Sequence, residues 1–196
     1  MILDCAAIAP GHEGQNHPMD DIVKQALIKW PQVPDCYGWL GLDRRGGWYL
    51  RDEATQAQGA FPQSKGVLLQ HEKLIAFIGR NYEVDAQGQW YFQNGPQRVY
   101  VELECAPWIW HVQSDLGLMS HTGRTATPLT CLTDENGWIY FLTDLGLGLV
   151  HSQDAGMVAD AIDGGRWTPE STTTQDLCKL YRYVWSPKAR QQGREA

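Results

Sequence analysis

Apolar side chains recur at the spacing of an α-helix in two segments of the chain. Residues 19–30 and 70–79 both place apolar residues three and four positions apart, so that these residues share one face of a helix. Pro31 follows the first segment directly, and proline ends a helix because it lacks an N–H group. A third, shorter helix is predicted over residues 153–162, with Ser152 as its N-terminal cap.

A hairpin pattern occurs three times along the chain. Each copy has an apolar strand end, a polar turn that contains glycine, and a tryptophan that opens an aromatic strand. Glycine suits such turns because it adopts positive φ angles without steric cost. The copies are residues 42–50, 84–92 and, more loosely, 132–140. Their likeness predicts an internal duplication, with the tryptophans on equivalent sides of their hairpins.

Further strands are predicted between and after these hairpins. Apolar and polar residues alternate over residues 98–104, and residues 108–112 form a short apolar run after a proline. Residues 138–151 are predicted to form another hairpin, residues 180–185 a last strand, and residues 113–130 a loop. Hairpins that alternate with single helices are typical of an α+β fold, here with a mostly antiparallel sheet of tryptophan-containing hairpins and a few short helices.

The patterned part of the chain indicates a single domain. Residues 1–18 contain prolines, glycines and no sustained periodicity, so we expect a flexible leader there. Residues 19–186 carry all the predicted helices and strands and are expected to form one α+β domain. Residues 187–196 are polar, and we expect them to be a frayed tail.

The net charge and the cysteines limit which partners and which cellular compartment are expected. The net charge is −7, whereas nucleic-acid binding needs a basic stripe, so no nucleic-acid partner is expected. The five cysteines are scattered and show no paired spacing, which favours reduced thiols in the cytoplasm. No apolar stretch reaches the length of a membrane span. Nine tryptophans indicate an aromatic core or an aromatic-lined cleft.

Two segments resemble a known family. They are IGRNYEVDAQGQWYFQNGPQRVYVELECAPWIW at residues 78–110 and YGWLGLDRRGGWYL at residues 37–50. The chain resembles, over residues 19–185, a family of uncharacterised, mainly proteobacterial proteins that share a domain of unknown function. The resemblance implies a single bacterial domain and brings no activity, cofactor or catalytic residue with it.

No arrangement of residues matches a catalytic signature. Ser120 and His121 lie in a polar segment with Arg124, where His121 would act as a base and Arg124 would bind an anion. An ordinary polar loop is the alternative. The six histidines lack the short spacings that metal ligands need, so we expect neither a metal site nor a cofactor.

Two arginines and two tyrosines are candidates for ligand binding. Arg80 and Arg98 flank half-buried elements, and with Tyr82, Tyr100 and Trp90 they would line a cleft for an acidic or planar ligand. The alternative is that both arginines form surface ion pairs with neighbouring acids.

The tryptophans of one strand form a second candidate. Trp108 and Trp110 are two residues apart, so their rings point to the same side of the strand and are able to contact one ligand. Packing in the core is the alternative.

Two hypotheses of function are consistent with these observations. The first is a non-enzymatic intracellular binding or protein-interaction module, for which self-association through an aromatic sheet face is one form. The second is a small-molecule enzyme or ligand-binding protein with a cleft lined by Arg80, Arg98, His111 and His121.

Overall fold

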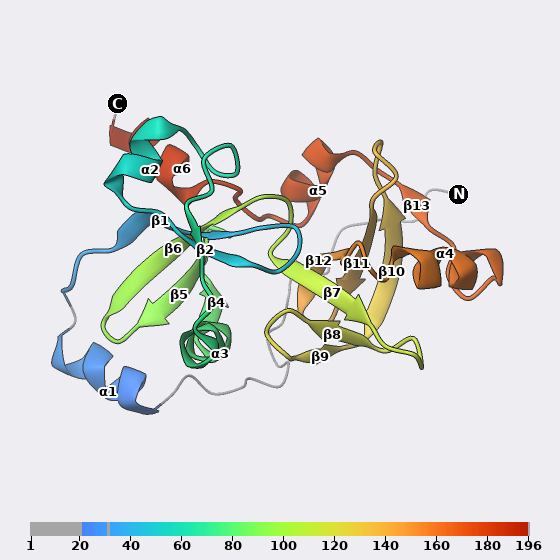
Figure 1. Ribbon diagram of the computed structural model, residues 1–196, viewed down its shortest axis with the longest axis horizontal. Helices are drawn as coiled ribbons and strands as arrows, with labels where there is room; N and C mark the ends of the chain where they lie inside the picture. The colour runs from blue at the N-terminus through green and yellow to red at the C-terminus, as the bar shows by residue number, and fades with distance from the viewer. Residues whose placement is uncertain (1–20, 31, 196) are drawn as a thin grey trace.

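Short strands build two mixed sheets that lie side by side, as Figure 1 shows. The computed structural model describes residues 21–30 and 32–195, and the expected leader over residues 1–18 lies outside this range. The helices are α1 (Asp21–Lys29), α2 (Glu53–Gln58), α3 (Glu72–Arg80), α4 (Ala155–Asp163), α5 (Thr174–Leu180) and α6 (Pro187–Glu195).

The first sheet has six strands and the second has seven. The first contains β1 (Cys36–Leu42), β2 (Trp48–Leu50), β3 (Val67–Leu68), β4 (Tyr82–Val84), β5 (Trp90–Asn94) and β6 (Gln97–Leu103). The second contains β7 (Trp108–Val112), β8 (Leu118–Ser120), β9 (Thr125–Ala126), β10 (Pro128–Thr133), β11 (Ile139–Thr143), β12 (Gly146–Val150) and β13 (Glu170–Ser171).

Both sheets have the same topology. The strand order is β3-β2-β1-β6-β5-β4 in the first and β13-β10-β11-β12-β7-β8-β9 in the second. Each therefore joins two three-stranded antiparallel meanders through one parallel pair, β1 with β6 and β7 with β12. Strand β13 adds a second parallel pair at the edge of the second sheet. The predicted α+β class, the mainly antiparallel pairing and the internal duplication are confirmed.

One type of turn occurs five times in the two sheets. In three copies an aspartate carboxylate accepts hydrogen bonds from the backbone N–H groups two and four residues later. These three are the turns that precede Trp48, Trp90 and Trp138. The fourth residue of every copy has a positive φ angle, which glycine adopts most readily. These residues are Gly46, Gly88, Leu116, Gly123 and Gly137.

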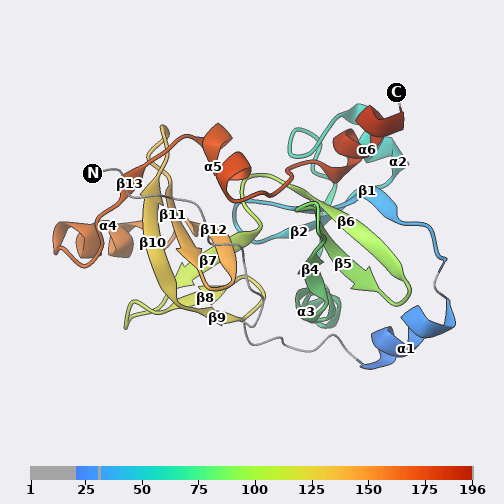
Figure 2. The same cartoon turned by 180° about the vertical axis from the view of Figure 1, so that it is seen from behind.

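The core is continuous across both sheets. Buried residues from β1, β2, every strand from β4 to β8, and β10, β11 and β12 form one hydrophobic cluster. The rings of Trp90 and Trp108 meet edge to face with centroids 5.1 Å apart, so they join the first sheet to the second. Helices α2 and α6 lie beyond one side of the first sheet and α3 beyond the opposite side, as both views show (Figures 1 and 2).

Two segments differ from the sequence-based expectations. Residues 113–130, expected as a loop, contain β8, β9 and the start of β10, because two of the five turns fold them into hairpins. Residues 180–185 were expected as a strand, but Leu180 ends α5 and residues 181–185 form no strand, with a φ of 52° at Arg182. Their backbone instead bonds to isolated partners, such as Val184 N–H to the Gly88 carbonyl at 3.0 Å.

The segment expected as a polar tail forms helix α6. Ser186 caps it, because its Oγ accepts from Ala189 N–H at 3.1 Å, and Pro187 occupies the first helical position. Lys188 N–H donates to the buried Glu102 carboxylate at 3.1 Å, which ties the helix to β6. Similarly, α4 begins after Asp154 and not after Ser152. Among the described residues, no helix has the length and apolar character needed to cross a membrane.

Candidate metal centre

Three potential metal ligands converge near the carboxyl ends of β12 and β7, adjacent strands in the middle of the second sheet. His111, His151 and Asp154 each offer one ligand atom, and these atoms all lie within 4.8 Å of one another. His111 Nδ1 lies 3.1 Å from Asp154 Oδ2, and the centroids of the two imidazole rings are 4.5 Å apart. Two histidines and one carboxylate form a common ligand set for divalent transition metals.

Parallel pairing of β7 and β12 brings the two histidines together. Val150 pairs with Trp110, and His151 N–H donates to the Trp110 carbonyl at 2.8 Å, so His151, directly after β12, lies beside His111 near the carboxyl end of β7. A turn then places Asp154 close by, because its N–H donates to the His151 carbonyl at 2.9 Å.

Asp154 is held toward the site by the backbone. It occupies the N-cap position of α4, but its side chain makes no capping hydrogen bond to that helix. Its Oδ2 atom instead accepts from Val112 N–H at 3.3 Å and lies beside His111. The carboxylate therefore bridges the helix start and the end of β7.

The three side chains are accessible to different degrees. The side chains of His111 and Asp154 are 35% and 19% exposed, and His151 as a residue is 7% exposed. Burial, followed by the charge of His111, lowers the pKa of His151 below its ordinary value. His151 is therefore neutral at pH 7, which is the state that ligates a metal.

The arginines and tyrosines predicted from sequence lie in the first sheet and its helix. Arg80 ends α3, with its guanidinium carbon 6.0 Å from the Phe77 ring centroid. Arg98 is exposed on β6, 4.8 Å from the ring centroid of Tyr91. Tyr100 is buried and its hydroxyl donates to Asp85 at 3.2 Å.

The other predicted residues surround the junction of the two sheets. Trp108 and Trp110 stack with centroids 5.8 Å apart, which agrees with rings on one side of the strand. They are 2% and 0% exposed, so a ligand at the surface reaches neither ring. The buried Tyr82 hydroxyl donates to the Pro107 carbonyl at 3.1 Å, and the Arg124 guanidinium carbon lies 5.7 Å from the Trp108 ring centroid.

His121 packs into this aromatic junction. Its Nδ1 accepts from Ile109 N–H at 3.3 Å, so the ring proton sits on Nε2, an atom that is buried without a hydrogen-bond partner. The ring lies within 6 Å of Trp48, Tyr82 and Trp108, whose π faces are weak acceptors for that N–H. Burial, followed by the charges of His111 and Arg124, lowers the pKa of His121 to about 3.

The residues predicted to line one cleft thus lie in separate parts of the structure. They are Arg80, Arg98, His111 and His121. Among the described residues, Arg98 contacts Tyr91 on the first sheet, whereas His111 contacts His151 beside the second. His151 and Asp154 were not among the residues predicted from the sequence. Their spacing, a histidine followed three residues later by an aspartate after an apolar strand, was the available signal.

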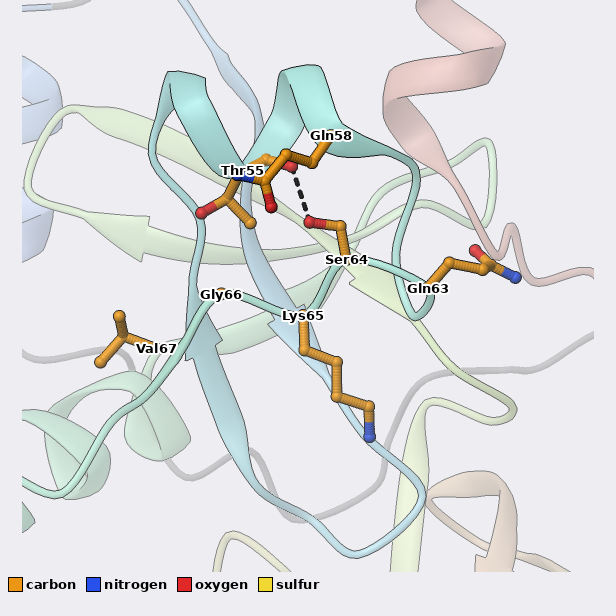
Figure 3. A pocket seen from close by; sticks show the side chains of 7 residues that line it. All are labelled: Thr55, Gln58, Gln63, Ser64, Lys65, Gly66 and Val67. Carbon is orange, nitrogen blue, oxygen red and sulfur yellow. Dashed lines mark hydrogen bonds between the residues drawn. The ribbon is translucent and has the colours of Figure 1, made fainter.

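A separate hollow of about 500 Å³ lies beside α2 in the first half (Figure 3). It is lined mainly by polar side chains and its one cation, Lys65, is already bound to Glu104 at 2.8 Å and to Asp43 at 3.3 Å. The hollow therefore offers little charge to a ligand. Its lining residues are Thr55, Gln58, Gln63, Ser64, Lys65, Gly66 and Val67.

Fold and site together define a two-sheet α+β protein with a candidate metal centre. The family model DUF2944, described as "Protein of unknown function (DUF2946)", matches residues 19–191, and the chain belongs to this family. This confirms the resemblance to an uncharacterised family that the sequence shows. A search of curated proteins gives no match.

Two solved structures of DUF1285 family proteins are similar to the chain. The protein from Silicibacter pomeroyi DSS-3 has 12% identity and a TM-score of 0.45, over 66% of this chain and 72% of that chain. The protein from Shewanella baltica OS155 has 13% identity and a TM-score of 0.41, over 63% and 91%. Neither TM-score reaches 0.5.

Proposed function

We propose that the protein is a non-enzymatic binding module, and that its ligand is a divalent transition-metal ion held by His111, His151 and Asp154. The observation that carries the proposal is the convergence of three ligand atoms within 4.8 Å. Metal–nitrogen and metal–oxygen bonds of about 2.0–2.2 Å place neighbouring ligand atoms about 3 Å apart. His111 Nδ1 and Asp154 Oδ2 already have this separation, at 3.1 Å.

The ligand types favour a transition metal over calcium or magnesium. Imidazole nitrogen suits zinc, copper, nickel and iron, whereas calcium and magnesium take oxygen ligands. The neutral state of His151 supports binding at pH 7, since no proton has to leave that ring first.

A hydrogen bond between His111 and Asp154 that serves only to position α4 is the simpler alternative. The internal duplication argues against a need for two histidines here. At the equivalent place in the first sheet, Gly41 pairs with Glu102, so the fold forms without an imidazole on either strand. His151 also has a structural contact of its own, since its Nδ1 accepts from Gln153 N–H at 3.2 Å, and this bond alone explains the position of the ring.

Calorimetric titration of the full chain with Zn²⁺ tests the proposal. We expect one ion to bind per chain at this site, and Asp154→Asn or His111→Gln to weaken its binding by at least about tenfold. Both substitutions keep the size of the side chain. If these variants bind Zn²⁺ as the unchanged protein does, the proposal is wrong.

Two control variants separate this site from other histidines. His71→Asn removes an imidazole from the N-cap of α3 while keeping a side chain that caps helices well. A variant with both His12 and His17 changed to Asn removes the histidines of the N-terminal segment. Both controls should leave Zn²⁺ binding at the candidate centre unchanged.

Self-association is a second candidate function, with a second copy of this chain as the partner. The β2–β3 edge of the first sheet exposes Leu50, Val67 and Leu68, which are 46%, 72% and 44% exposed. Leu50 and Val67 face each other across the strand pair, and apolar side chains at a sheet edge favour antiparallel pairing with another copy. We expect a dimer by size-exclusion chromatography with light scattering, and a monomer after Val67→Lys.

We also propose a cytoplasmic location. Cys36, Cys105, Cys131 and Cys178 are all free thiols, which supports a reducing compartment. Fractionation of cells that express the tagged full chain tests this location, and recovery with periplasmic or secreted proteins would count against it.

A further inference from the structure

Strand β8 places a methionine directly opposite one of the candidate metal ligands. Met119 pairs with His111 across the antiparallel ladder of β7 and β8. Residues paired in this way project to the same side of the sheet, with Cβ atoms about 4.5–5.5 Å apart. The strand order β12-β7-β8 puts the strand that precedes His151 on one side of His111 and the strand of Met119 on the other. The Met119 side chain therefore lies on the face of the sheet that carries the His111 imidazole.

Backbone hydrogen bonds fix this register on both sides of the pair. His121 N–H donates to the Ile109 carbonyl at 2.8 Å, and Gln113 N–H donates to the Gly117 carbonyl at 2.8 Å. The two bonds join residues that lie two positions before and two positions after His111 in β7. Met119 is therefore held opposite His111 and does not slip along the ladder.

Packing in the core does not account for Met119. The residue is half-buried. Within the described part of the chain, it belongs neither to the hydrophobic cluster nor to the partly buried apolar residues that pack against that cluster. Its cross-strand neighbours are polar on both sides, His111 on β7 and Thr125 on β9. Met119 thus stands between an imidazole and a threonine, where an apolar side chain gains little from packing.

A thioether changes which metal ion the centre prefers. Methionine sulfur is a soft ligand that favours Cu⁺, and among divalent first-row ions Cu²⁺ binds nitrogen and oxygen ligands most tightly. Three protein ligands leave at least one coordination position open. Methionine is unbranched, with three rotatable bonds, so its sulfur adapts to a position offered by the adjacent strand.

We infer that the metal ion of this centre is copper, and that the Met119 sulfur is its fourth ligand when copper is present as Cu⁺. The inference names the metal of the centre and rests on the proposed metal site of His111, His151 and Asp154. It adds a soft ligand that the register of β7 and β8 supplies.

Methyl NMR of the full chain, labelled with ¹³C at the methionine methyl groups, tests the inference. Cu⁺ is added without oxygen, and a methyl signal moves when the sulfur beside it binds a metal ion. We expect the Met119 signal, identified by its loss in Met119→Leu, to move until it saturates. Met157 on α4 is 39% exposed, and its signal should stay in place as an internal control.

Competition with a chromogenic Cu⁺ chelator measures the contribution of the sulfur. Cys5→Ser, Cys36→Ser and Cys178→Ser are combined in the background, because their thiols would compete for Cu⁺. Met119→Leu conserves volume, so the fold is retained. It should weaken Cu⁺ binding at least about tenfold and Zn²⁺ binding less than about twofold. Met157→Leu is the matched control and should change neither affinity.

The outcomes separate this inference from the proposed function. If Zn²⁺ binds but Cu⁺ leaves the Met119 signal unmoved, the inference is wrong while the metal site stands. The inference is also wrong if the signal moves equally in His111→Gln, since Met119 would then bind copper apart from the centre. Equal weakening of Cu⁺ and Zn²⁺ by Met119→Leu would show that the residue supports the fold and is no soft ligand. Failure of both ions to bind overturns the proposed function itself.

Discussion

Glu102 on β6 and His151 at the end of β12 hold equivalent positions in the two halves of the chain. Glu102 pairs with Gly41, which lies two residues before the turn that starts at Asp43. His151 adjoins His111, which lies two residues before the matching turn that starts at Gln113. The same pair of positions is thus occupied by Gly41 and Glu102 in the first sheet and by His111 and His151 in the second.

The two pairs of positions differ in the residues that cover them. Glu102 is 3% exposed, and it accepts hydrogen bonds from Ser186 Oγ and Lys188 N–H at the start of α6. Phe61 fills the space above Gly41, since a Cβ there would lie 2.6 Å from its ring. At the second pair the start of α4 contributes Asp154, whose carboxylate lies beside His111, and the His111 side chain remains 35% exposed. The duplication therefore supplies a structural site in the first half and an accessible one in the second.

Saturation with metal should stabilise the folded protein. A ligand that binds only the native state adds about 2.7 kcal/mol at a free concentration 100 times its Kd. Thermal unfolding with Zn²⁺ added should therefore show a rise in Tm of several degrees, which a chelator such as EDTA reverses.

Asp154→Asn tests whether this rise comes from the proposed centre. The variant loses the charged ligand, so its Tm should respond to Zn²⁺ much less than that of the unchanged protein. The same rise in both proteins would place the ion elsewhere.

Local patterns in the sequence were sufficient to predict the hairpins and the first helices. The turns before Trp48, Trp90 and Trp138 are visible because glycine and aspartate recur at fixed offsets. The turn at residues 113–117 was missed because Leu116, with a φ of 65°, stands where the others have glycine. Ser186 and Pro187 were an overlooked helix start, since serine at the N-cap and proline at the next position form a recognised pair.

The residues of the candidate metal centre were harder to predict because they meet through long-range strand pairing. His111 and His151 adjoin only through the parallel register of β7 and β12, and periodicity predicts strands without saying which strands pair. The burial of Trp108 and Trp110 has the same origin. Alternation predicts that both rings lie on one side of the strand. It does not predict that the rest of the core covers this side.

Acid should destabilise the protein through His121. The pKa of His121 is about 3 in the folded state and about 6.5 in the unfolded chain, so only the unfolded chain takes up the proton between these values. The contribution is fully present above pH 6.5 and is lost as the pH falls toward 3. At pH 5 the loss is about 2 kcal/mol, measurable as a lower urea midpoint.

His121→Phe separates this effect from other titrations. We expect the stability of the variant at pH 7 to be lower than that of the unchanged protein. Because the variant lacks the proton-binding group, its stability should fall less between pH 7 and pH 5. Identical pH dependence of the two proteins would mean that another group causes the acid sensitivity.

Arg51 should be among the residues most costly to replace. It is 2% exposed, and its guanidinium donates to the carbonyls of Ser64, Gly38 and Gly59 at 3.0, 3.1 and 2.7 Å. Arg51→Met leaves these buried acceptors unpaired and removes a positive charge that acts on Glu102, so we expect a loss of about 3–5 kcal/mol.

Arg44→Met is the comparison for this substitution. Arg44 is half-exposed in an ion pair with Glu104, and exposed pairs contribute about 0–1 kcal/mol. Urea unfolding of the two variants should therefore separate them clearly. Losses of similar size would show that the three carbonyl bonds of Arg51 contribute little.

Gly88 and Gly137 provide a matched pair for the fourth position of the repeated turn. Their φ angles are 78° and 76°, so alanine meets the same left-handed strain of about 1–2 kcal/mol at both positions. A Cβ on Gly88 would also meet the Arg182 carbonyl oxygen, whereas nothing lies within 4 Å of a Cβ on Gly137. Gly88→Ala should therefore cost about 1–3 kcal/mol more than Gly137→Ala in urea unfolding. Equal costs would mean that the segment around Arg182 moves away without loss, and that its bond from Val184 N–H to the Gly88 carbonyl does not hold it in place.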